Sequence, residues 1–231
     1  TVFSTIANAG TTQLQGCAIS PETFIPAAFS FQSTDPATNQ LTGSANQSAS
    51  IDVNGHQSFV LSLTPSEAFP PTEVFFNYTC NSNVAVDPVG GVNTLLISAS
   101  DQPVPDVIAL VASATPGQVI LDGNGNGAFA VATVNVGSSG TVRFQAEGMS
   151  NLTLASCQTN PIDGTCQNPV SPTITPIELI VDANATPTFA VFVSTEEAVI
   201  DFDPANKRVF FNARNIAGDL IGSSSVAVSK P

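Results

Sequence analysis

Short apolar runs separated by turn residues repeat along the whole chain. Examples are FSFQS, SFVLSL and NTLLISAS in the first half, and DVIALVAS, GAFAVATVNV and TFAVFVS in the second. These runs have the length of strands and are rich in β-branched and aromatic residues, and Gly, Pro, Asn and Asp separate them. Seventeen prolines and sixteen glycines disfavour long helices. We therefore predict an all-β protein, and a β-sandwich in preference to a barrel or jelly roll.

The pattern occurs twice. Residues 51–69 align without a gap on residues 181–199. Asp52, Asn54, Phe59, Glu67 and Ala68 recur as Asp182, Asn184, Phe189, Glu197 and Ala198. Asn8–Gly10 likewise matches Asn135–Gly137, and FFN at 75–77 matches FFN at 210–212. We predict two tandem immunoglobulin-like sandwiches, residues 1–103 and 104–231, with Phe59 and Phe189 in equivalent core positions.

The first copy is the shorter one. The second begins with VPDVIALVASATPGQVILDGNG (104–125), and the first has no counterpart because the sequence starts at Thr1. We expect residues 104–125 to supply an opening strand or two that the first sandwich lacks. An open sheet edge invites pairing with another segment, so the pattern predicts strand complementation. The donors expected are residues 1–10 of a neighbouring copy or else the 104–113 run, and the alternative is closure of the first domain by its own chain.

Composition narrows the functional classes. The chain has 5 Lys and Arg against 18 Asp and Glu, a net charge of −13, and no Lys or Arg before Arg143. Nucleic acids and anionic membranes both require basic patches, so neither is an expected partner. No apolar run is long enough to span a bilayer. A start at Thr is typical of a mature exported chain, although an artificially chosen start would look the same.

Four cysteines in such a chain predict two disulfides and an oxidising compartment. Cys157 and Cys166 flank QTNPIDGT, which has the Pro and Asp-Gly of a hairpin tip. Cys17 and Cys80 are then left to pair across the first copy, at a separation typical of the inter-sheet bridge of immunoglobulin-like domains. Zinc is the other use of four cysteines, but the sequence has no C-x-x-C pair and its one histidine, His56, is distant.

The segments CQTNPIDGTC, TPTFAVFV and IDFDPANKRVFF resemble a module of uncharacterised secreted and surface proteins of bacteria. NGHQSFVLSLTPSEAF through GGVNTLLISASDQPVPDVIAL is similar to the other half of that module, so the resemblance extends from about residue 50 onward. It implies export and an immunoglobulin-like role. It carries no known activity.

Candidate chemistry is sparse. His56 follows Asn54-Gly55, a hairpin tip, and no nucleophile is near it in sequence. The acidic clusters Glu196/Glu197 and Asp201/Asp203 are interpreted as turn and rim residues in preference to a glycosidase pair. Asp122, Asn124 and Asn126 match the start of a calcium loop, but Thr133 occupies its last position, so a glycine-rich hairpin connection is favoured over a weak calcium site. We expect no catalysis and no cofactor.

Two further features concern glycans. Asn46, Asn77, Asn151 and Asn184 carry N-x-S/T sequons, which are acceptors for N-glycosylation, but this composition yields that number by chance. Flat aromatic platforms for sugars are missing, since the chain has no Trp and one Tyr.

The favoured function is a noncatalytic extracellular structural protein, a subunit of a surface filament or pilus-like homopolymer. The alternative is a monomeric adhesin or a carbohydrate-binding module of a secreted protein.

Overall fold

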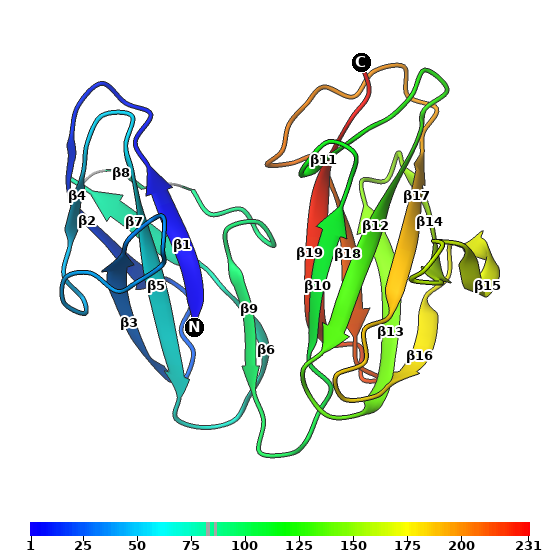
Figure 1. Cartoon of the computed structure of the whole chain (residues 1–231), viewed down its shortest axis with the longest axis horizontal. Helices are drawn as coiled ribbons and strands as arrows, with labels where there is room; N and C mark the ends of the chain where they lie inside the picture. Colours follow the sequence, from blue (N-terminus) through cyan, green and yellow to red (C-terminus); the bar gives the residue numbers. More distant parts are fainter. Residues whose placement is uncertain (82–83, 86) are drawn as a thin grey trace. The chain divides into compact units, whose positions relative to one another are not determined.

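The computed structural model describes residues 1–81, 84–85 and 87–231, and all regular structure in them is β (Figure 1). The all-β expectation is therefore confirmed. The chain divides into two compact units, Thr1–Ser100 and Asp101–Pro231. The part of the chain that is described contains no helix long and apolar enough to cross a membrane.

The first unit is built from strands in three sheets. The strands are β1 (Val2–Ala7), β2 (Leu14–Pro21), β3 (Ala27–Thr34), β4 (Ala49–Ile51), β5 (His56–Pro65), β6 (Phe69–Val74), β7 (Phe76–Cys80), β8 (Val84–Ala85) and β9 (Leu95–Ala99). Their sheet orders are β1-β5-β3, β4-β2-β7-β8 and β6-β9. The antiparallel pairing of β1 with β5 sets Ser4 opposite Phe59.

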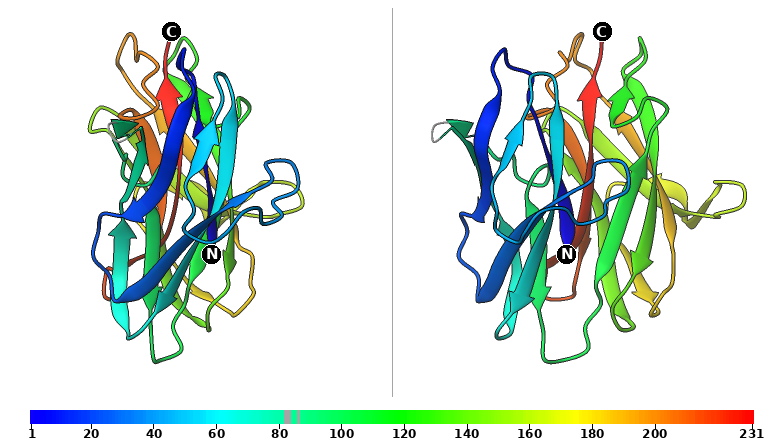
Figure 2. Two further views of the ribbon diagram at one scale, coloured as in Figure 1. Left: turned by 90° about the vertical axis from the view of Figure 1, so that its left-hand side faces the viewer. Right: turned by 60° about the vertical axis from the view of Figure 1, so that its left-hand side comes forward.

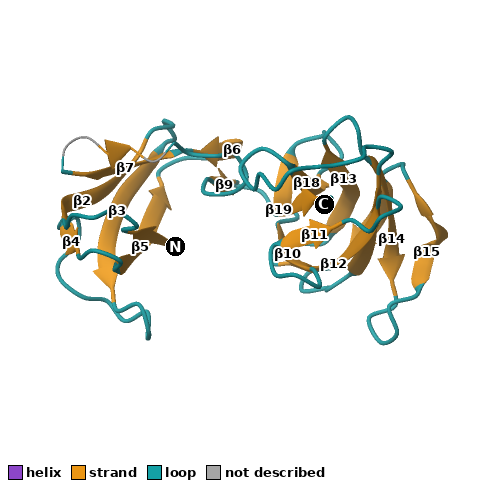
Figure 3. Cartoon of the chain, turned by 90° about the horizontal axis from the view of Figure 1, so that it is seen from above, coloured by secondary structure: helices purple, strands orange, loops and turns teal. Residues whose placement is uncertain are grey.

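The second unit has two five-stranded sheets, which Figure 3 shows as two layers. Its strands are β10 (Val107–Ala112), β11 (Gln118–Ile120), β12 (Asn126–Asn135), β13 (Gly140–Gly148), β14 (Thr153–Thr159), β15 (Cys166–Thr173), β16 (Ile177–Val181), β17 (Thr188–Ser194), β18 (Arg208–Arg214) and β19 (Leu220–Ser229). The sheet orders are β10-β12-β17-β14-β15 and β11-β19-β18-β13-β16.

The strand orders of the two units correspond. The series β1-β5-β3 matches β12-β17-β14, and β4-β2-β7 matches β16-β13-β18. Asn54 and Asn184, both before the strand that carries the central Phe, have positive φ of 58° and 63°. The second unit also has β10 beside β12 and β11 beside β19, and both strands come from residues 104–125. The first unit lacks an equivalent of either strand within its described residues, as the sequence predicts.

Each unit packs its own aromatic core. Phe59 is 0% and Phe189 1% exposed, so the prediction that both occupy the core is confirmed. In the second unit the rings of Phe144, Phe189 and Phe211 pack together, with centroids 4.5 to 6.0 Å apart, and they come from both sheets. Figure 2 shows the strands that carry these cores from two further sides.

The structure pairs Cys17 with Cys80 and Cys157 with Cys166. The second bridge joins β14 to β15 at the base of a hairpin. The first does not lie where we expected. It links β2 and β7, which are neighbours in one sheet, so the inter-sheet position is wrong. The two residues face each other across an antiparallel pair with Cα atoms 4.1 Å apart, close enough for a bridge without crossing the core.

Truncating the central rings tests the core assignment. Phe59→Ala and Phe189→Ala should each lower the free energy of unfolding by about 3–5 kcal/mol in urea titrations, because each leaves a cavity in a close-packed interior. Phe24→Ala is the control, since Phe24 is 91% exposed. A Phe59→Ala loss no larger than that of the control would contradict the assignment.

Removing the disulfides should have unequal effects. Cys17 and Cys80 are 63 residues apart, whereas Cys157 and Cys166 are 9 apart. The loop-entropy relation gives about 4 kcal/mol for the long loop and about 2.6 kcal/mol for the short one. Chemical unfolding of the Cys17→Ala/Cys80→Ala and Cys157→Ala/Cys166→Ala variants measures both, and the reverse ranking would refute this expectation.

Candidate functional site

The candidate site is the strand position beside β1 that β10 occupies in the second unit. β12 has β17 on one side and β10 on the other, whereas β1 pairs with β5 alone among the described residues. β1 stands at the end of the sheet order β1-β5-β3, and Figure 1 shows it with the N-terminus at its start. The backbone groups on the outer edge of β1 are therefore open to pairing.

In the second unit, residues 104–125 also complete the core. Val107 and Val119 are each 4% exposed and Leu121 is 1% exposed, and Ala109 and Val111 pack against the same cluster. Ile108 and Leu110 alternate with these residues and face solvent, at 50% and 68% exposure. The segment is thus an amphipathic strand with its apolar side inside the sandwich.

The first unit shows the effect of lacking this cover. Val2 and Ser4 occupy the positions of Phe129 and Val131. In the first unit Val2 lies opposite Leu61 and Ser4 opposite Phe59. In the second unit Phe129 lies opposite Val191 and Val131 opposite Phe189. Phe129 and Val131 are buried, whereas Val2 and Ser4 are only half-buried. Phe3, on the outer face of β1, is 54% exposed.

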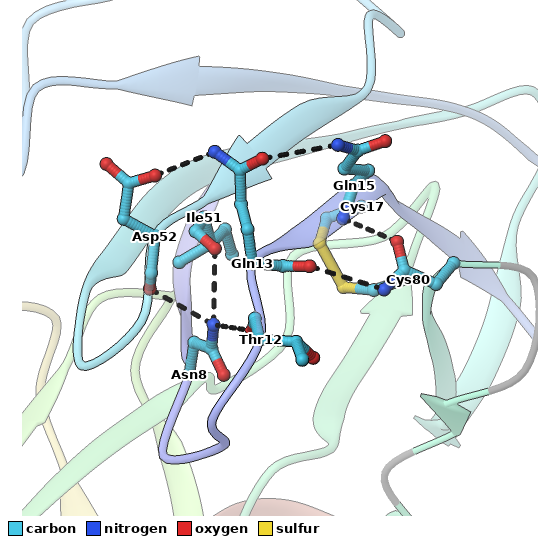
Figure 4. Close-up of a disulfide and its surroundings, with 9 residues drawn as sticks. Asn8, Thr12, Gln13, Gln15, Cys17, Ile51, Asp52 and Cys80 are labelled. Carbon is cyan, nitrogen blue, oxygen red and sulfur yellow. Dashed lines mark hydrogen bonds between the residues drawn. A yellow bond between two sulfur atoms is a disulfide. The ribbon is translucent and has the colours of Figure 1, made fainter.

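A buried asparagine follows β1 and ends β12. Asn8 is 4% and Asn135 1% exposed. The Asn8 amide donates to the carbonyls of Thr12, Ile51 and Asp52 at 2.9, 3.2 and 3.1 Å (Figure 4). The Asn135 amide donates in the same way to the carbonyls of Ser138, Val181 and Asp182. Each asparagine also accepts a hydrogen bond from the amide of the glycine two residues on. We call each arrangement an asparagine corner.

In the second unit the corner holds the segment that leads into β10. The Asp106 amide donates to Asn135 Oδ1 at 3.0 Å. The amides of Val136 and Ser138 donate to the carbonyls of Asp106 and Val104, at 2.8 and 3.0 Å. These three hydrogen bonds attach the incoming strand by its backbone.

In the first unit the same three positions are open. Asn8 Oδ1 accepts only the Gly10 amide in the described structure. Ala9 stands where Val136 stands, and Thr12, whose carbonyl accepts the Asn8 amide, takes the place of Ser138. The amides of Ala9 and Thr12 have no protein partner among the residues described. The first corner thus has all the hydrogen bonds that its own unit supplies to the asparagine side chain. The hydrogen bonds it lacks are those to an incoming strand.

A glycine in each corner marks where that strand passes. A Cβ on Gly137 would overlap the Val104 carbonyl oxygen and lie 2.6 Å from the Asp106 nitrogen, so glycine is required by the packed backbone. Neither Gly137 nor Gly10 is among the glycines with positive φ. A Cβ on Gly10 would meet only Asn8 Oδ1, at 3.2 Å. No backbone atom described in its own chain therefore requires glycine at position 10.

The other residues singled out in the sequence are dispersed. His56 is exposed at the start of β5, opposite Ala7. Glu196 and Glu197 line an open hollow after β17, and Asp203 caps a turn before β18. The Asn206 side chain bonds the Asp203 carboxylate and lowers its pKa. These contacts are those of turn and rim residues.

The calcium candidate is a turn between β11 and β12. Asp122 Oδ1 accepts the amides of Asn124 and Asn126, both at 2.9 Å. This oxygen therefore closes the turn itself. No group of three or more His, Cys, Asp or Glu side chains that could hold a metal occurs in the described part of the chain.

The sequons lie in different settings. Asn46, Asn151 and Asn184 are exposed, and Asn77 is half-buried within β7. Asn46 Oδ1 accepts the Phe31 amide at 3.0 Å, so its side chain has a structural contact.

Comparisons with known proteins add little. No protein-family model matches the chain, and no curated protein matches it. Solved structures that resemble it include the major pilin subunit BcpA of Bacillus cereus, at 12% identity and a TM-score of 0.33, and a variant of that pilin at 13% identity and the same TM-score. Each alignment covers 94% of this chain and 69% of the pilin. A likeness this weak does not bear on what the protein does.

The two corner glycines should respond differently to a methyl group. Gly137→Ala should destabilise the protein by about 1–3 kcal/mol in thermal unfolding, because the Cβ overlaps the backbone of the segment entering β10. Gly10→Ala, measured in dilute solution, should stay within about 0.5 kcal/mol of the parent chain. A loss at Gly10 equal to that at Gly137 would mean that Gly10 serves its own chain.

Proposed function

We propose that this protein is a noncatalytic extracellular structural protein, a subunit of a surface filament or pilus-like homopolymer assembled by strand complementation. The observation that carries the proposal is the pair of asparagine corners. One corner holds the incoming segment by three hydrogen bonds to its backbone, and the other presents the same kinds of group without such a segment. Strand addition uses this kind of site, because backbone hydrogen bonds supply affinity and alternate side chains supply specificity.

The free energy favours filling the position. An incoming strand would cover Val2 and Ser4, and burial of apolar surface contributes about 25 cal/mol per Å². It would also pair the edge amides and carbonyls of β1, which otherwise depend on water. The second unit is an internal reference, since the equivalent core positions there are buried once β10 is in place.

The donors predicted from the sequence both lie in their own sheets. Residues 2–7 pair with β5 and residues 107–112 pair with β12. A second copy therefore has to present a strand that remains part of its own fold, or exchange one. Deleting residues 1–10 would remove the buried Ile6 together with the donor strand. Such a deletion therefore does not separate assembly from the folding of the first unit.

Other features support the compartment and the class. Two disulfides are typical of proteins outside the reducing cytosol. The acidic and histidine candidates serve turns or lie exposed. A monomeric adhesin or glycan-binding module is the second candidate, and the exposed tip of the disulfide-bonded hairpin favours it, since Ile162 there is 92% exposed.

The decisive experiment supplies the strand within one chain. Residues 104–113 are duplicated ahead of Thr1 through a short glycine-containing turn, which lets the added strand run antiparallel to β1. We expect the parent protein to form species larger than a monomer in light scattering at high concentration. The self-complemented chain should form smaller species than the parent protein at the same concentration, and it should melt at a higher temperature.

The matched control carries Val107→Asp, Ala109→Asp and Val111→Asp in the added strand only. Its inward side chains are charged and cannot enter the core, so it should neither raise the melting temperature nor block assembly. A parent protein that stays strictly monomeric at high concentration would overturn the polymer and leave the adhesin.

A further inference from the structure

The second unit specifies what the open position accepts. In the β10–β12 pair, Val107, Ala109 and Val111 lie opposite Asn135, Thr133 and Val131. The equivalent residues of β1 are Asn8, Ile6 and Ser4, in that order. The occupant must therefore run antiparallel to β1. Opposite Asn8, Ile6 and Ser4, in that order, it must place a side chain of the size of valine, then a small one, then another of the size of valine. The residues between them face solvent.

β1 itself meets this specification. VFSTIA (2–7) aligns position by position with VIALVA (107–112). Val2, Ser4 and Ile6 take the inward places of Val107, Ala109 and Val111. Outward, Phe3 is 54% exposed where Ile108 is 50% exposed. The strand that borders the vacancy thus has the side-chain pattern of the strand that would fill it.

The register of two such strands is self-consistent. If Val2 of a second copy lies opposite Asn8, Ser4 of that copy lies opposite Ile6, and Thr5 lies opposite Thr5. An antiparallel pair centred on one residue is symmetric, so a twofold axis passes through Thr5 and both copies make the same contacts.

The backbone groups have the right orientation for this register. The Asn8 amide points to β5, where it donates to the Gly55 carbonyl at 2.9 Å. Because orientation alternates along a strand, Phe3, Thr5 and Ala7 direct their amides and carbonyls to the open edge. In the symmetric register Phe3 faces Ala7 and Thr5 faces Thr5, and each such pair exchanges both N–H···O bonds. The Thr1 nitrogen of the second copy then reaches Asn8 Oδ1, as the Asp106 nitrogen reaches Asn135 Oδ1.

Charge permits this approach. The chain carries a net −13, so most of its surface repels a second copy. No Asp, Glu, Lys or Arg occurs in residues 1–10, β5 or β3, which form the whole sheet that would be extended.

We propose that the vacant position beside β1 is filled by β1 of a second copy, paired antiparallel about a twofold axis at Thr5, so that two first units share one continuous sheet. The inference rests on the proposed function, because it names the partner strand for the same site. A pair of this kind closes on itself, so a filament grows beyond two copies through a second contact elsewhere.

Disulfide trapping tests the axis. All four native cysteines are paired, so an introduced thiol reports only its own position. Thr5 is exposed, and directly opposed residues of a hydrogen-bonded antiparallel pair have Cα atoms about 5.5 Å apart, within reach of a disulfide. Under mild oxidation Thr5→Cys should run at twice the monomer mass on a non-reducing gel.

Two matched variants on the same strand fix the register. Phe3→Cys alone should run at the monomer mass on the same gel, because Phe3 faces Ala7 of the second copy and lies several residues along the strand from the Phe3 of that copy. A mixture of Phe3→Cys and Ala7→Cys chains should cross-link. Self-linking of Phe3→Cys as fast as Thr5→Cys would overturn the register and the proposal.

The outcomes separate this inference from the proposed function. If the parent protein assembles but Thr5→Cys does not cross-link, the β1–β1 pair is wrong and strand complementation by another segment stands. If the parent protein does not assemble at all, both fail.

Discussion

The structure depends on how the last strand of each sheet satisfies its backbone. An edge strand exposes a row of amides and carbonyls, and a two-sheet sandwich also exposes the side of its core at that edge. The second unit meets both needs with one segment, since residues 104–125 pair with β12 and β19 and place apolar side chains between the sheets. The first unit has the same framework without that segment. Val2 at the side of its core is therefore only half-buried, and the outer edge of β1 has no pairing strand among the described residues.

The asparagine corner explains why this edge is expected to bind one strand in one register and not any extended chain. A bare edge pairs with any extended chain, in any register that its side chains tolerate. A buried asparagine whose amide is fully used by its own unit, with one carbonyl oxygen directed at the incoming backbone, fixes where that chain must begin. A glycine beside it leaves the room that the chain requires. Register is thus set at one end by hydrogen bonds and along the strand by alternate side chains.

Much of the fold can be predicted from the sequence, because its determinants are local. Strand-length apolar runs, turn residues and the gap-free match of 51–69 with 181–199 predict the β class, the buried Phe59 and Phe189, and the extra opening strands. The even cysteine count and the hairpin spacing predict the pairing. The position of the Cys17–Cys80 bridge could not be predicted, because sequence separation does not distinguish neighbouring strands of one sheet from facing strands of two.

The candidate site was visible only in part. The repeated Asn-x-Gly was a signal, but its meaning lies in carbonyls that are remote in sequence, at Ile51 and Asp52 for Asn8. Likewise, the resemblance of 2–7 to 107–112 has no meaning until the structure shows that one strand borders the place where the other belongs.

The uneven distribution of Lys and Arg along the chain determines how salt concentration affects contacts made by the first unit. All five Lys and Arg residues follow position 142, so the six carboxylates of the first hundred residues have no cationic side chain of that unit to offset them. Two first units then repel each other through charges of one sign, and dissolved ions screen this repulsion. At about 0.15 M salt the field decays over roughly 8 Å, and at 0.01 M over roughly 30 Å. Contact through the first unit should therefore strengthen as ionic strength rises, which is the opposite of an association held together by salt bridges.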